Sequence, residues 1–319
     1  MRSSTLFAIV GTVAAAEAFE LPGRGLLPSI SIGIGAKPSA SPAAGSCPSV
    51  WNDVVTELHA AFLGSNGQCN DLARQAVRAG FHDCGTYRPS MGTSAGCDGS
   101  FILAKEYENS ENKGLQQIGD FYTGVLQKFK VGAGDLIQMG ASTATVTCPL
   151  GPVVQTFVGR PDRKTANPTG ILPSPFDPAS KTIPLFEGYG LTSDDFVALL
   201  GAHTTSTQKF VDPQKAGAGQ DTTPGTWDVK YYGQTLDKKA PFTFESDKSV
   251  ANNSQTSGTF KAFVNNQFGW NVAFAQAMTK LSLVGVPGGS SKLIDCTSAL
   301  PAGTVKRDIR AAPINGRAI

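Results

Sequence analysis

Apolar residues recur along this chain at the three- and four-residue spacing of an α-helix. The first clear series shares one helical face: Val50, Val54, Leu58 and Phe62. Alternation of apolar and polar residues, the pattern of strands, is scarce, and 36 glycines and 20 prolines mark many loops. There is no internal repeat. The pattern predicts a mostly α-helical fold of about ten helices.

Two of the predicted helices begin at recognisable capping residues. Asn70 is a favourable N-cap, and no proline interrupts residues 71–84. Arg78 and His82 then stand at positions i and i+4 on one face of that helix, whereas Asp83 lies about 100° further round.

The second start is Thr192, which with Asp195 resembles a capping box in which Asp replaces Glu. The apolar positions that follow stand at i, i+3, i+4 and i+7: Phe196, Leu199, Leu200 and His203. This spacing predicts one apolar helical face that ends on a histidine.

The pair formed by Arg78 and His82 suits the cleavage of hydrogen peroxide. An imidazole, whose ordinary pKa is about 6.5, can take a proton from the peroxide and return it to the leaving oxygen. A guanidinium beside it can stabilise the charge that develops as the O–O bond breaks. The alternative interpretation is a surface helix with an Arg/His pair that has no catalytic role.

His203 is a candidate axial ligand, because a neutral imidazole that faces an apolar pocket is what a haem iron needs. Such a ligand normally has a carboxylate on its other ring nitrogen, and Asp247 is a candidate that spacing alone does not select. The alternative is a core histidine hydrogen-bonded to its neighbours. His59, the third of the three histidines, is interpreted as structural.

The ends of the chain differ in composition from its middle. Residues 1–18 contain a mostly apolar run and a small-residue end, which predict a signal peptide, and residues 19–46 are interpreted as a linker or propeptide. Residues 1–46 hold three Lys/Arg and two Asp/Glu, the tail 301–319 holds four and one, and residues 47–300 hold 20 and 22. The pI of 8.2 therefore comes from the termini. Neither nucleic-acid binding nor a membrane span is predicted.

Together the motifs resemble the secreted haem peroxidases of the plant, fungal and bacterial superfamily, and the fungal secretory branch most. The resemblance covers residues 47–301. Four residues match the distal motif of that family: Arg78, Phe81, His82 and Asp83. Residues 199–204 match its proximal motif, and Asp247 falls where the family has the Asp that hydrogen-bonds the axial histidine.

The resemblance implies a fold and an activity. One haem b per chain would lie between a distal half (47–170) and a proximal half (171–300), with His203 as its axial ligand. Hydrogen peroxide would oxidise the resting haem, and two one-electron donations from small phenols or aromatic amines would return it to rest. The enzyme would be a secreted monomer.

The resemblance also assigns neighbours to His82. Asn112 would orient its imidazole, and Phe81 would line the distal side of the haem. The partner of Asn112 would be Glu106 or Glu108, and the different loop length leaves that choice open.

Two groups of oxygen-bearing residues accompany the two histidines, and the resemblance implies a structural calcium ion at each. The distal group is Asp83, Gly96, Asp98 and Ser100. The proximal group is Thr204, Asp221, Thr223, Thr226 and Asp228. Carboxylate, hydroxyl and backbone oxygens are hard ligands that suit Ca²⁺, although each run is also a common turn or loop.

Six cysteines in an exported chain suggest three disulfides, whose pairing the cysteine count alone leaves open. The resemblance implies three bridges: Cys47–Cys296, Cys69–Cys148 and Cys84–Cys97. The last of them departs from typical fungal members. Asn252 begins an Asn-Asn-Ser sequence and is a candidate N-glycan acceptor, provided that it faces outward.

Substrate choice is indicated partly by what the chain lacks. Manganese-oxidising members of the family have acidic residues at the positions of Asp71, Gln75 and Lys209, so a poor Mn²⁺ site is expected here. Lignin-oxidising members carry a surface Trp at the position of Ala198. Small aromatic donors at the haem edge are therefore the expected substrates.

Two other functions remain open. One is a non-catalytic secreted protein that binds haem and calcium on a peroxidase fold. The other is a His/Asp metal hydrolase, but the chain contains no H-x-x-x-H or similar ligand spacing to support it.

Overall fold

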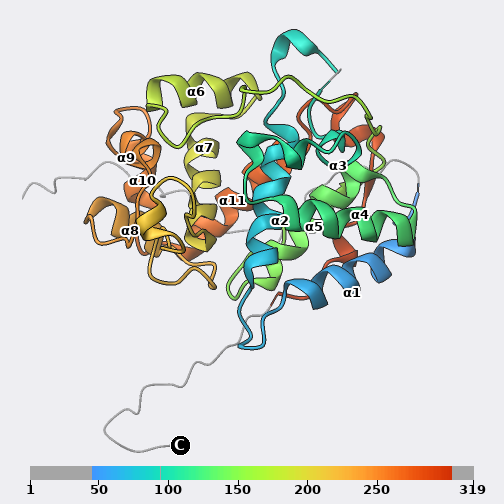
Figure 1. Cartoon of the computed structure of the whole chain (residues 1–319), viewed down its shortest axis with the longest axis horizontal. Coiled ribbons are helices and arrows are strands. Elements are labelled where there is room, and N and C mark those ends of the chain that lie inside the picture. Colours follow the sequence, from blue (N-terminus) through green and yellow to red (C-terminus); the bar gives the residue numbers. More distant parts are fainter. Residues whose placement is uncertain (1–44, 94, 304–319) are drawn as a thin grey trace, which may run out of the picture. The chain divides into compact units, whose positions relative to one another are not determined.

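The computed structural model describes residues 45–93 and 95–303. Within them the chain forms eleven α-helices, short 3₁₀ turns and one two-stranded sheet (Figure 1). The helices are α1 (Val50–Phe62), α2 (Asp71–Cys84), α3 (Ser100–Leu103), α4 (Gln116–Phe129), α5 (Ala133–Thr147), α6 (Ala179–Gly188), α7 (Ser193–Leu200), α8 (Lys230–Leu236), α9 (Glu245–Asn252), α10 (Ser257–Ala262) and α11 (Gln267–Leu281). The strands are β1 (Phe157–Val158) and β2 (Ile294–Asp295). The prediction of a mostly α-helical fold is confirmed.

Three of the predicted segments lie wholly or mostly outside the described residues. They are the signal peptide (1–18), the linker or propeptide (19–46) and the C-terminal tail (301–319).

Helix α5 is central to the distal half, because all 15 of its residues are buried. Helices α1 and α2 both pack against it, and Figure 1 shows α2 beside α5. The close approach of α2 depends on Gly80, where an added Cβ would stand 2.6 Å from the Cβ of Ala141. Asn70 caps α2 as predicted, since its side chain accepts a hydrogen bond from the backbone N–H of Ala73.

Helix α7 begins at the predicted capping box, in which the side chains of Thr192 and Asp195 each accept from the other's backbone N–H. The helix ends at Leu200, and Gly201–Thr205 continue as a 3₁₀ turn that carries His203. The expected helical face therefore stops one turn before the histidine.

Buried aromatic rings surround the end of α7. A Cβ at Gly201 would clash with the Tyr232 hydroxyl and the Trp270 indole. The Nε1 of Trp270 donates to the carbonyl of Ala198 at 2.9 Å, and its ring stacks on Trp227 with 5.1 Å between centroids. Helix α11 also packs along α7, so contacts with distant segments surround the point where the helix gives way to the turn.

The three disulfides have the pairing that the resemblance implied: Cys47–Cys296, Cys69–Cys148 and Cys84–Cys97. The first bridge ties the segment before α1 to the segment after β2, and β2 pairs antiparallel with β1. Residues 294–296 thus pack against the first part of the described chain, at β1 and Cys47, although they follow α11 in the sequence.

Candidate active site

Helix α2 brings Arg78 and His82 into direct contact. The Nε of Arg78 donates a hydrogen bond to Nε2 of His82 at 3.0 Å, and its Nη1 donates to the carbonyl of Lys113 at 3.0 Å. The imidazole is only 9% exposed, so the alternative of an Arg/His pair on an open surface does not describe this helix. The ring of Phe81 stands edge-on to His82, with 5.7 Å between centroids.

Asn112 holds the other nitrogen of His82. Its Oδ1 lies 2.5 Å from Nδ1 of the imidazole, while its Nδ2 donates to the backbone carbonyl of Glu106 at 2.7 Å. The second bond determines the amide orientation, and the amide oxygen then requires a proton on Nδ1. His82 therefore carries its proton on Nδ1 and presents a lone pair at Nε2.

The partner of Asn112 is thus Glu106 rather than Glu108. The contact uses the main-chain carbonyl, which the sequence did not indicate. The carboxylate of Glu106 instead accepts from the backbone N–H of Asn167 at 2.6 Å.

Burial and neighbouring charge set the protonation state of this pair. Burial and the positive charge of Arg78 lower the pKa of His82 well below its ordinary value, and the hydrogen bond to Asn112 opposes this only in part. Burial also lowers the pKa of Arg78 to about 10, so its guanidinium stays charged at neutral pH. The arrangement places a neutral base beside a cation.

His203 has a different set of neighbours. Its Nδ1 lies 3.1 Å from Oδ2 of Asp247, a fully buried residue of α9. The rings of Tyr231 and Phe244 both stand edge-on to the imidazole, each with 5.8 Å between centroids. No described residue hydrogen-bonds to Nε2, and the side chain is 31% exposed. Among the described residues, His203 is therefore hydrogen-bonded at one ring nitrogen and not at the other.

One residue of this region was missed by the sequence reasoning. Gln220 is 1% exposed, and its Nε2 donates to Oδ2 of Asp247 at 2.8 Å. The only available signal was its position next to Asp221, and a glutamine beside a loop carboxylate has no specific meaning by itself.

The predicted distal calcium residues lie around the end of α2. Asp83 is fully buried, and its carboxylate accepts from the backbone N–H groups of Gly99 and Phe101, each at 3.2 Å. Oδ2 of Asp98 is buried without a hydrogen-bond partner among the described residues. Burial and the charge of Asp98 raise the pKa of Asp83 well above its ordinary value.

Gly96 and Ser100 complete the distal group in different ways. Gly96 adopts a φ of 126° and packs against the backbone of Val284, which leaves no room for a side chain. The Oγ of Ser100 accepts a hydrogen bond from Nδ2 of Asn167 at 2.9 Å.

The predicted proximal calcium residues also come together. The hydroxyl of Thr204 bonds to Asp221, and the hydroxyl of Thr223 donates to Asp228 at 2.8 Å. The backbone N–H of Thr226 donates to the carbonyl of Thr223 at 2.9 Å, which closes the loop. Burial raises the pKa of Asp221 to about 6. Among the described residues, no three His, Cys, Asp or Glu side chains converge as a metal-binding group.

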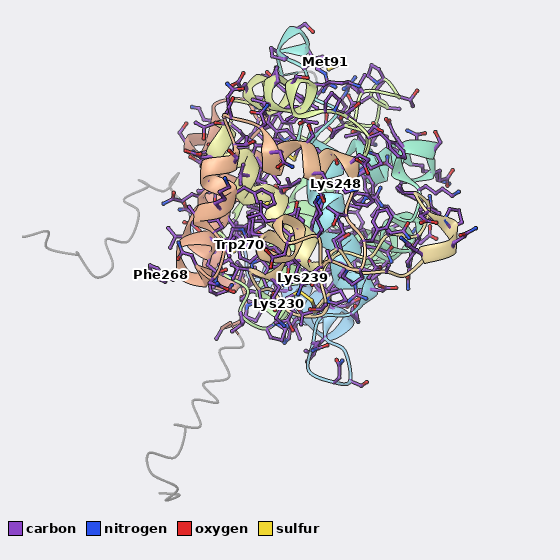
Figure 2. All side chains as sticks on the ribbon, turned by 90° about the vertical axis from the view of Figure 1, so that its left-hand side faces the viewer. Met91, Lys230, Lys239, Lys248, Phe268 and Trp270 are labelled. Atoms are coloured by element: carbon purple, nitrogen blue, oxygen red, sulfur yellow. A yellow bond between two sulfur atoms is a disulfide. The ribbon has the colours of Figure 1, made fainter. Side chains whose placement is uncertain are left out.

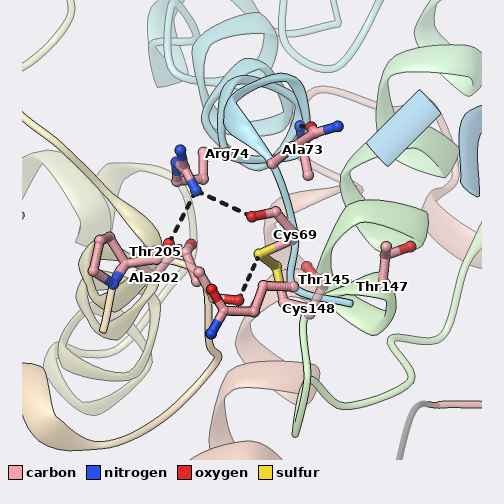
Figure 3. The surroundings of a disulfide bond; sticks show 12 residues. Cys69, Ala73, Arg74, Thr145, Thr147, Cys148, Ala202 and Thr205 are labelled. Carbon is pink, nitrogen blue, oxygen red and sulfur yellow. Dashed lines mark hydrogen bonds between the residues drawn. A yellow bond between two sulfur atoms is a disulfide. The ribbon is translucent and has the colours of Figure 1, made fainter. Parts of the chain in front are cut away.

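The proximal loop is anchored to the start of α2. Figure 3 shows Arg74 beside the Cys69–Cys148 bridge, where its Nη1 donates to the carbonyls of Cys69 and Pro224 at 3.1 and 3.3 Å. Pro224 belongs to the loop that carries Thr223 and Thr226. Hydrogen bonds from Arg74 therefore join the start of α2 to the loop that carries the predicted proximal calcium residues.

The structure also describes the positions at which relatives have manganese ligands or a surface tryptophan. Lys209 Nζ lies 3.2 Å from Oδ2 of Asp71, and Arg74 pairs with the other carboxylate oxygen. Gln75 donates to Gln117 at 3.1 Å. Ala198, at the position of the surface Trp, is fully buried.

Surface features outside the site bear on other predictions. Figure 2 labels Lys230, Lys239 and Lys248 on one face, and each has a carboxylate within 4.0 Å. Asn252 is exposed at the end of α9, and its amide donates to the carbonyl of Lys248 at 2.7 Å. In the described part of the chain, no helix combines the length and apolar character needed to cross a bilayer.

Known proteins resemble this chain over most of its length. A family model described as Peroxidase matches residues 52–266. The chain is 30% identical to a low-redox potential peroxidase of Taiwanofungus camphoratus, over 79% of this chain and 77% of that protein. It is 27% identical to a versatile peroxidase of Pleurotus eryngii, over 79% and 73%. It is 28% identical to manganese peroxidase 3 of Phlebia radiata, over 81% of each.

Proposed function

This chain belongs to the peroxidase family, and from that premise we propose that it is a secreted haem peroxidase. It reduces hydrogen peroxide and oxidises small phenols or aromatic amines in one-electron steps. The observation that carries this proposal is the contrast between the two histidines. Both ring nitrogens of His82 are hydrogen-bonded beside the cation of Arg78, whereas His203 has one nitrogen near a buried carboxylate and the other without a partner among the described residues.

The residues present fit one haem b per chain. His203 would hold the iron, because the bond from Nδ1 to Asp247 leaves the Nε2 lone pair available. His82 is less suited to that task, because it lies beside the cation of Arg78 and has a neutral amide rather than a carboxylate at Nδ1. When bound, the haem supplies an iron that hydrogen peroxide oxidises and that aromatic donors reduce again.

The distal residues move the proton. The Nε2 lone pair of His82 takes a proton from hydrogen peroxide and returns it to the leaving oxygen. The guanidinium of Arg78 stabilises the negative charge that develops as the O–O bond breaks. Asn112 orients the imidazole, because it determines which nitrogen carries the proton.

The test is haem uptake followed by turnover. Purified protein supplied with haem should show a haem absorption band and oxidise a simple phenol only when hydrogen peroxide is added. A haem band without turnover would indicate the non-catalytic binding protein instead. Absence of any haem uptake by folded protein would contradict the proposal.

Manganese is not expected to be a substrate. The one carboxylate at the corresponding positions, Asp71, is already paired with Lys209 and Arg74. Addition of Mn²⁺ to the phenol assay should therefore leave the rate unchanged. A Mn²⁺-dependent increase would show that this interpretation of the position is wrong.

Two structural calcium ions are part of the proposal. The distal ion would use Asp83, Asp98 and Ser100 with the backbone of Gly96, and it would offset the cost of burying carboxylates close together. The proximal ion would use the carboxylates and hydroxyls of the second cluster: Thr204, Asp221, Thr223, Thr226 and Asp228.

Chelation tests the calcium proposal. One proposed ligand of each ion follows a histidine directly in the sequence, Asp83 after His82 and Thr204 after His203. Removal of either ion should therefore lower the melting temperature and slow the reaction with hydrogen peroxide. Metal analysis before and after prolonged chelation establishes that calcium was present and is gone. Unchanged stability and rate after verified removal would refute the structural role.

The disulfides and the glycosylation sequon bear on where the protein is located. Three disulfides and the exposed Asn252 sequon support an exported glycoprotein, because disulfides persist in oxidising compartments. We propose that the mature protein is a secreted monomer. A mass measurement in solution and detection of the glycan at Asn252 would test these points.

A further inference from the structure

The buried contact between Gln220 and Asp247 has no part in the function described so far. Nε2 of Gln220 donates to Oδ2 of Asp247 at 2.8 Å, and neither residue is more than 1% exposed. We propose that Gln220 is a positioning residue that weakens Asp247 as an acceptor and so limits the anionic character of His203. This inference rests on the proposed function, in which His203 is the iron ligand.

The two donors compete for one oxygen. Oδ2 of Asp247 lies 2.8 Å from Nε2 of Gln220 and 3.1 Å from Nδ1 of His203. A carboxylate oxygen that accepts from an amide has less electron density to share with a second donor. The imidazole therefore receives a weaker hydrogen bond than an unshared carboxylate would provide, and a weaker pull on the Nδ1 proton makes Nε2 a less electron-rich ligand.

Packing alone does not account for an amide at this position. Oε1 of Gln220 is buried with no hydrogen-bond partner among the described residues, and an unsatisfied buried acceptor is destabilising. An apolar side chain of similar length would avoid that cost. The amide is therefore explained by its one directed contact, which is the bond to Asp247.

The backbone holds Gln220 in place for this contact. Its N–H donates to the carbonyl of Ser206 at 3.1 Å, three residues beyond His203. The turn that carries the histidine and the segment that carries the glutamine are thus joined directly. A change at Gln220 should act on the electronic state of His203 without displacing the ring.

The test uses the haem-loaded protein and a side chain of similar shape. Gln220→Met keeps the unbranched length and removes the N–H donor. The variant should bind haem, and its Fe(III)/Fe(II) midpoint potential should shift to a more negative value, because a more anionic imidazole stabilises the ferric state. The iron–histidine stretching frequency of the ferrous form, read by resonance Raman spectroscopy, should rise.

Gln138→Met is the matched control. Gln138 is also 1% exposed, also has an Oε1 without a partner among the described residues, and also donates through Nε2, in its case to the carbonyl of Gly80 at 3.0 Å. It lies on α5, its amide also lies 3.2 Å from Sγ of Cys84, and it forms no hydrogen bond with His203 or Asp247. Its replacement should leave both the potential and the stretching frequency unchanged.

A double variant shows whether the effect passes through Asp247. In an Asp247→Asn background, Gln220→Met should shift the potential much less than it does in the parent protein. Equal shifts in both backgrounds, or no shift in a folded, haem-loaded Gln220→Met protein, would overturn the proposal. If Gln220→Met does not fold, Gln220→Leu removes the same donor and the same criteria apply.

The outcome is separable from that of the proposed function. Failure of the parent protein to bind haem or to oxidise phenols would remove the peroxidase assignment. Normal haem binding and turnover with an unchanged potential in the variant would remove only the role of Gln220.

Discussion

The two histidine regions of this molecule place the same side chain among neighbours of opposite character. On the distal side, His82 accepts from a guanidinium at one nitrogen and is held by a neutral amide at the other. On the proximal side, Nδ1 of His203 faces a buried carboxylate and Nε2 bonds to no described residue. The cation favours a neutral base, whereas the carboxylate favours an electron-rich ligand. The role proposed for each imidazole therefore follows from its partners rather than from its own chemistry.

The largest effect is expected from removal of the proposed iron ligand on the proximal side. His203→Ala should abolish haem binding, because no other described group offers a free imidazole lone pair in that position. The ratio of haem to protein absorbance after purification measures the loss. His59→Ala is the control, since in the described part of the chain the His59 imidazole hydrogen-bonds only to Thr147, at 2.8 Å, and its loss should leave haem content unchanged. A normal haem spectrum in His203→Ala would contradict the assignment of the ligand.

Loss of the distal base should be the next largest effect. His82→Leu should retain haem, which His203 would hold, but slow the reaction with hydrogen peroxide by about 10²–10⁴-fold. Stopped-flow mixing with peroxide isolates this step from the oxidation of donors. A variant that reacts at the parent rate would show that His82 is not the base.

Removal of the distal cation should cost less and should also change the pH dependence. Arg78→Leu should slow the peroxide step by about 10²–10³-fold. His82 must be neutral to accept a proton, so the rate falls as the pH drops through its pKa. Because the charge of Arg78 helps to hold that pKa well below its ordinary value, the variant should lose activity at a higher pH than the parent. Coincident acid limbs in the two pH–rate profiles would argue against this coupling.

The smallest effect is expected at the residue that only orients the base. Asn112→Val removes one neutral hydrogen bond, which is worth about 1 kcal/mol or roughly fivefold in rate. The peroxide step should slow by about that factor, with haem content and the proximal spectrum unchanged. If Asn112→Val were as slow as His82→Leu, Asn112 would have to take part in the chemistry itself.

Several features could be predicted because they depend on residues close together in the chain. The start of α2 at Asn70 and the capping box at Thr192 rest on hydrogen bonds that span three residues. The contact between Arg78 and His82 follows from one helical turn. The disulfide pairing and the role of Asp247 came instead from resemblance to a family. The cysteine count left the pairing open, and spacing along the chain did not single out Asp247.

Other features depended on contacts between distant segments, so the tertiary structure alone decided them. Trp270 and Tyr232 pack at Gly201 and accompany the end of α7, although local spacing favoured a longer helix. Glu106 contacts Asn112 through a main-chain carbonyl, which every residue possesses and which no sequence pattern can single out. Gln220 reaches Asp247 across 27 residues of chain. A local pattern records hydrogen bonds within a few residues, whereas these partners are chosen by how the helices pack, and packing depends on the whole chain at once.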